Sequence, residues 1–132
     1  MTAHATRISV RTDQAPTPGG AYSQAIVAGG FLYTAGISPD DPATGQIVGD
    51  TIEEQTRQVM ANLAAVLAAH GLDFGHVVKT TVHLQDVHRD RPGFNQAYET
   101  WLNPPYPART TVGSELAEGL VEIDLVAVCP QT

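Results

Sequence analysis

The sequence predicts an α+β protein in which two helices pack on one face of a single sheet. Six segments have the composition or the period-two alternation of β-strands, and only two have the apolar spacing of an amphipathic helix. Two helices cannot cover both faces of such a sheet, so the other face is left to solvent or to another subunit. The predicted order is β-β-β-α-β-α-β-β, in one domain that spans residues 1–132.

The first half of the chain predicts a strand pair followed by a long helix. Gly29-Gly30 separates two apolar runs and predicts a hairpin turn, because both glycines tolerate positive φ. Thr51 and Glu54 form a capping-box pattern that predicts the start of a helix. The three predicted strands and the helix span residues 8–10, 22–28, 31–36 and 51–69.

One face of this helix is predicted to enter the core. Its apolar residues recur at helical spacing, and two amides lie close to the same stripe. His70-Gly71 is a typical helix end, with a glycine able to adopt the left-handed conformation. The stripe consists of Ile52, Val59, Leu63, Val66 and Leu67, with Gln55 and Asn62 beside it.

The second half predicts one more helix between strands. This helix is expected to begin near Pro92, since proline is favoured in a first turn, and to stop at Asn103-Pro104-Pro105. In the last strand Glu122 and Asp124 share the face opposite the apolar one, and such a mixed face suits a subunit interface with a polar pocket. The strands are predicted at residues 77–84, 108–112 and 120–128.

Composition and charge exclude several classes of function. The net charge is −7 with only seven Lys and Arg residues, so nucleic acid is not an expected partner. No apolar run approaches the ~20 residues that span a bilayer, and the first residues lack a signal-peptide core, so a cytoplasmic protein without membrane contact is expected. The single Cys129 excludes an internal disulfide.

No motif for a metal or a nucleotide stands out. The sequence has no P-loop, no dinucleotide-binding glycine pattern, no HExxH and no CxxC. The histidines lack compact ligand spacing, so each is interpreted as a surface or cap residue and no metal site is expected. They are His4, His70, His76, His83 and His88.

Two charged residues in predicted strands are the candidates for chemistry. Arg109 follows a Pro-rich turn at the entrance of a strand, where its planar fork can bind a carboxylate. Glu122 lies in the middle of an apolar strand, where a carboxylate can act as a general base. Taken alone, each residue is more typical of an ordinary surface position, with Arg109 extended over the sheet edge and Glu122 solvated.

Seven short segments in order resemble the Rid family (RidA/YjgF, reactive-intermediate deaminases) over nearly the whole chain. Each is weak alone, but their order and spacing together make the resemblance specific. They are GAYSQA at 20–25, YTAG at 33–36, Gln55 with Asn62, VVKTTV at 77–82, NQAY at 95–98, PAR at 107–109 and VEI at 121–123.

The resemblance implies a chorismate-mutase-like fold and a homotrimer with three clefts between subunits. It also implies hydrolysis of enamine and imine intermediates, such as 2-iminopropanoate and 2-iminobutanoate, to 2-oxo acids and ammonia without a cofactor. Arg109 would clamp the substrate carboxylate, and Glu122 would activate water or protonate the enamine carbon. The residues implied to line the substrate site are Tyr22, Ala35, Gly36, Asn95, Thr110 and Thr111.

The chain departs from the family pattern at four places. Ala35 stands where many members have a serine hydroxyl, and Thr111 stands where many have cysteine. The loop before Pro107 and the turn at 113–120 are both short. The clamp is intact but the pocket is reshaped. Two alternatives therefore stay open: a pathway-specific enamine such as an aminoacrylate- or aminomuconate-like compound, and a non-catalytic trimer that binds small carboxylates or acts as a chaperone.

Overall fold

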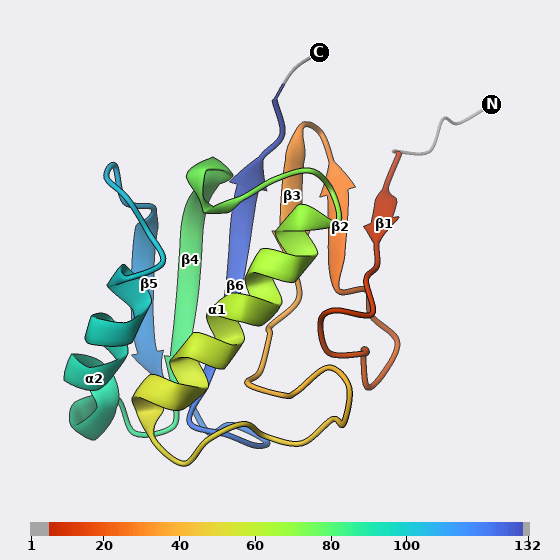
Figure 1. Cartoon of the computed structure of the whole chain (residues 1–132). Coiled ribbons are helices and arrows are strands. Elements are labelled where there is room, and N and C mark those ends of the chain that lie inside the picture. Colours follow the sequence, from red (N-terminus) through yellow and green to blue (C-terminus); the bar gives the residue numbers. More distant parts are fainter. Residues whose placement is uncertain (1–5, 131–132) are drawn as a thin grey trace.

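A computed structural model describes residues 6–130 as one six-stranded sheet with two helices on one face (Figure 1). The strand order across the sheet is β1-β2-β3-β6-β4-β5; β4 and β5 are parallel and the other neighbours antiparallel. This arrangement confirms the predicted fold class. The strands are β1 (Ile8–Val10), β2 (Ala25–Ala28), β3 (Phe31–Thr34), β4 (Val77–Leu84), β5 (Ala108–Gly113) and β6 (Val121–Val128).

The long helix α1 (Ile52–Ala68) has the predicted cap and buried face. The Thr51 hydroxyl accepts a hydrogen bond from the Glu54 N–H, and the Glu54 carboxylate accepts one from the Thr51 N–H. Every apolar residue of the predicted stripe is buried. The hairpin is confirmed too, because Gly29 and Gly30 have φ values of 59° and 84°.

The two amides beside the stripe hold loops against α1. The Gln55 side chain donates to the Gly49 carbonyl and accepts from the Leu120 N–H. The Asn62 amide donates to the carbonyls of Ser38 and Asp40. These bonds satisfy backbone groups that would otherwise be buried without partners, and they fix the long loop that follows β3.

The second helix α2 (Val87–Glu99) begins five residues before the predicted start at Pro92. The prediction was wrong because Asp86, not the proline, starts the helix: its carboxylate accepts from the Arg89 N–H. Pro92 lies inside the helix. A short 3₁₀ helix, η1 (Phe74–His76), which the sequence did not predict, leads into β4.

The strand β2 is shorter than predicted because Gln24 ties its start to a loop. The Gln24 side chain accepts from the Thr12 N–H and donates to the carbonyls of Thr12 and Pro16. Residues 22–24 therefore follow the loop rather than the sheet. The neighbouring strand β3 likewise ends at Thr34, two residues before the predicted end.

The two faces of the sheet have different environments. The helices cover one face, on which the alternate β6 residues from Val121 to Ala127 are at most 2% exposed. The opposite face, called here the open face, is not covered by any helix in Figure 1. It carries exposed apolar side chains beside polar ones, and the large ones are Phe31, Tyr33, Val112 and Val128. Within residues 6–130, neither helix is long and apolar enough to cross a membrane.

Candidate functional site

Arg109 lies on the helix-covered face of β5, over two aromatic rings of α2. It is paired in register with Thr80 of β4, and both side chains point toward α2. The guanidinium carbon is 5.5 Å from the Phe94 ring centroid and 5.1 Å from that of Tyr98. Both distances are within the range of cation–π contacts, so the rings support the guanidinium from one side.

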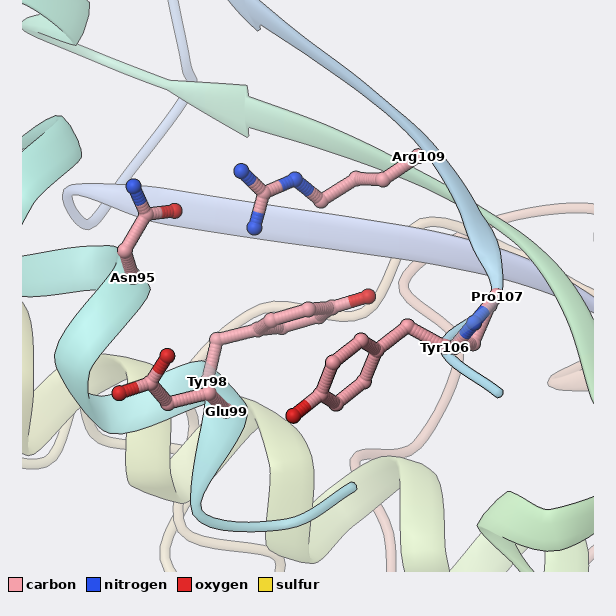
Figure 2. Close-up of a pocket in the computed structure, with 6 residues that line it drawn as sticks. All are labelled: Asn95, Tyr98, Glu99, Tyr106, Pro107 and Arg109. Atoms are coloured by element: carbon pink, nitrogen blue, oxygen red, sulfur yellow. The ribbon is translucent and has the colours of Figure 1, made fainter. Parts of the chain in front are cut away.

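The guanidinium borders a hollow of about 310 Å³ (Figure 2). Among residues 6–130, no carboxylate lies within 4.0 Å of the Arg109 nitrogens. A guanidinium that is held in place and has no acidic partner is suited to bind a carboxylate from outside. The hollow is lined by Asn95, Tyr98, Glu99, Tyr106, Pro107 and Arg109.

Two oxygen atoms close to Arg109 are buried without a hydrogen-bond partner within the described chain. They are Oδ1 of Asn95, on α2, and Oγ1 of Thr111, which follows Arg109 by two residues on the same face of β5. Buried polar atoms are nearly always paired, so unpaired ones mark positions where a ligand, water or second subunit can supply a donor. In Figure 2 the Asn95 amide lies beside the guanidinium.

A buried contact with β4 holds the Tyr98 side chain in place. Its hydroxyl is 2.8 Å from the Thr80 hydroxyl in a buried side-chain contact. Burial raises the pKa of Tyr98 above its ordinary value, opposed by the hydrogen bond to Thr80 and by the Arg109 charge. The sequence did not indicate this role of Tyr98, because Thr80 is distant from it in the chain.

Tyr98→Phe should lower the free energy of unfolding by roughly 1–3 kcal/mol, because it leaves the buried Thr80 hydroxyl without a partner. Chemical denaturation measures this change. Tyr106→Phe is the matched control, since the Tyr106 side chain is 60% exposed. Equal stability of the two variants would show that the Thr80–Tyr98 contact contributes nothing.

Glu122 lies on the opposite, open face of the sheet. Its neighbours Val121 and Ile123 are fully buried on the helix side, so the Glu122 side chain points away from the helices. The carboxylate packs against Gly36: a Cβ atom built on Gly36 would lie 2.6 Å from Glu122 Oε2. A glycine is therefore required at 36 for the carboxylate to hold this position.

The remaining predicted site residues do not line the hollow beside Arg109; they are Tyr22, Ala35, Gly36 and Thr110. Tyr22 and Gly36 line a second hollow of about 140 Å³, and the Gly19 N–H donates to the Tyr22 hydroxyl. The Ala35 N–H donates to the Gln24 carbonyl. Thr110 points to the open face, where its hydroxyl accepts from Lys79 Nζ at 2.7 Å.

One chain therefore does not bring Arg109 and Glu122 together. The two lie on opposite faces of the sheet and on strands separated by β4. A site built around both, as the sequence suggested, requires two chains. No group of three or more metal-binding side chains occurs in the described part of the chain.

Comparisons with known proteins agree on one family. The family model described as Endoribonuclease L-PSP matches residues 12–129. A RutC family protein of Pyrococcus horikoshii is 45% identical over 118 residues, which are 88% of this chain and 93% of the relative. The 2-iminobutanoate/2-iminopropanoate deaminase of Rattus norvegicus is 38% identical over 121 residues, which are 90% and 88% of the two chains.

A solved structure shares the fold over almost the whole chain. The structure of E. coli TdcF with bound serine matches with a TM-score of 0.86 and 30% sequence identity. The match covers 93% of this chain and 99% of that one. The arrangement of one six-stranded sheet with two helices is therefore the architecture of this relative as well.

Proposed function

The chain belongs to the YjgF/Rid family, to which the matched Endoribonuclease L-PSP model corresponds, and we propose that it hydrolyses small 2-imino acids to 2-oxo acids and ammonia. The observation that carries this proposal is Arg109, supported on two rings and facing an open hollow without an acidic partner. The name of the rat relative and the serine in the TdcF structure support a small carboxylate as ligand. A 2-imino acid has the same carboxylate.

In the proposed reaction, Arg109 binds the substrate carboxylate through paired N–H donors and thereby fixes C2. Glu122 takes a proton from water, whose oxygen bonds to C2 while the C=N double bond becomes a single bond. The Glu122 carboxylic acid returns this proton to the nitrogen, which gives a carbinolamine with one hydroxyl and one amino group on C2. Glu122 then takes the hydroxyl proton and passes it to the amino nitrogen, so that ammonia leaves as the C=O bond forms and Glu122 ends as the carboxylate it began as.

We propose that the site is completed between subunits of a homotrimer, with Arg109 from one subunit and Glu122 from its neighbour. The opposite-face placement of the two residues supports this, and so do the exposed apolar side chains of the open face. Light scattering should then give a mass about three times the 14.0 kDa of the chain. A monomeric mass would exclude a cleft shared between subunits.

Gly36→Ala should lower kcat, because the added methyl group collides with the Glu122 carboxylate. We expect a loss on the order of 10²-fold, the effect of displacing a reacting group by about 1 Å. Gly20→Ala is the matched control, since its Cβ would meet only the Tyr22 ring, at 3.7 Å. If both variants keep the parent rate, Glu122 does not act from this position.

The substrate is tested by generating 2-iminobutanoate with an amino-acid oxidase in the presence of semicarbazide, which traps the imine. The protein should lower the yield of trapped imine, since hydrolysis competes with trapping. An unchanged yield would reject the general deaminase. It would favour a pathway-specific enamine, which Ala35 makes plausible because it offers no hydroxyl and the nearby Thr34 hydroxyl already accepts from the Leu125 N–H.

A further inference from the structure

His83 lies on the open face near the end of β4, directly across from Glu122. It is the Cα partner of Glu122 in the β4–β6 pairing. Its Nδ1 is 2.9 Å from the Ser114 hydroxyl and its Nε2 is 3.4 Å from an Asp124 carboxylate oxygen. The hydrogen bond at Nδ1 therefore holds the ring to the residue that follows β5, and the ring lies beside Asp124 of β6.

This ring limits where the Glu122 carboxylate can go. On the other side of β6, the residue after Gly36 pairs with Ile123, which brings Gly36 against the carboxylate. Directly opposed residues of antiparallel strands have Cβ atoms about 5 Å apart, so His83 forms the second wall. Glu122 thus lies between Gly36, which has no side chain to displace it, and the His83 imidazole, which the Ser114 hydroxyl holds in place.

We propose that His83 is a positioning residue for Glu122, holding the carboxylate against Gly36. The inference rests on the proposed imine hydrolysis and adds to it a residue that touches no substrate. The Ser114 hydroxyl and the Asp124 carboxylate contact the two ring nitrogens and keep the His83 ring in this position. In the proposed site the substrate carboxylate is bound by Arg109 of the neighbouring subunit and His83 touches no substrate, so the loss of His83 should lower turnover more than affinity.

The kinetic test uses His83→Phe, which keeps an aromatic ring of similar size but has no ring nitrogen. We expect kcat for 2-iminobutanoate to fall about tenfold with KM changed less than about twofold, since orientation and not binding is lost. His83→Asn, which can keep the Ser114 contact, should recover part of the rate. His88→Phe, on the exposed side of α2, is the control.

A second measurement does not depend on activity. In protein labelled with ¹³C at glutamate carboxyls, the Glu122 signal of His83→Phe should differ from the parent signal, while that of His88→Phe should not. A parent kcat in His83→Phe, or a Glu122 signal that this substitution leaves unchanged, would overturn the inference. If the parent protein hydrolyses no imine, the proposed function fails, while the Glu122 signal still decides whether His83 governs that carboxylate.

Discussion

Arg109→Ala should reduce kcat/KM for 2-iminobutanoate by on the order of 10²–10³-fold. The proposed cleft between subunits would bury the pair of Arg109 and the substrate carboxylate, and truncating one partner of a buried charge pair costs roughly 2–5 kcal/mol. The loss should appear mainly in KM, since the substrate carboxylate loses its only cationic partner in the hollow. Semicarbazide competition at several substrate concentrations measures both constants. The variant should stay folded, because the guanidinium makes no ion pair among residues 6–130.

Two further variants sharpen this experiment. Arg109→Lys keeps the charge without the planar fork and should recover only part of the activity. Arg57→Ala removes an exposed arginine of α1 and should leave the rate unchanged. Full activity in Arg109→Ala would show that the carboxylate is bound elsewhere.

Glu122→Gln should lower kcat by roughly 10²–10⁴-fold, the usual contribution of a general acid–base group, while KM changes little. Glutamine has nearly the same shape, so its fit against Gly36 is kept and only proton transfer is removed. Titration calorimetry with 2-oxobutanoate separates the two effects, because this product carries the carboxylate but needs no catalysis. If affinity and turnover fell together, Glu122 would be a structural residue.

The sequence predicted the fold well where local pattern decides the structure. The apolar stripe and capping box of α1 are local features, and they placed the helix within one residue at each end. The start of α2 was missed because two start signals competed, and the Asp86 cap preceded the proline. The early start predicted for β2 failed because Gln24 makes bonds to residues far back in the chain, which no periodicity reveals.

The sequence predicted which residues form the site but not how they are arranged in space. The resemblance to a family indicated Arg109 and Glu122. The alternation along one strand, however, does not show which residues of another strand lie on the same side of the sheet. The β4–β5 register puts Arg109 on the face of Thr80, and the β4–β6 register puts Glu122 on the face of His83. His83 itself was interpreted as a surface residue, because its partners Ser114 and Asp124 are distant in sequence.

Complementation between two inactive variants tests the shared site most directly. Arg109→Ala and Glu122→Gln chains are co-expressed in equal amounts, so that mixed trimers form, and imine hydrolysis is measured. In any mixed trimer one of the clefts pairs an intact Arg109 with an intact Glu122, so roughly a quarter of the parent activity should return. A mixture as inactive as its two components would contradict a site that Arg109 and Glu122 complete from neighbouring subunits.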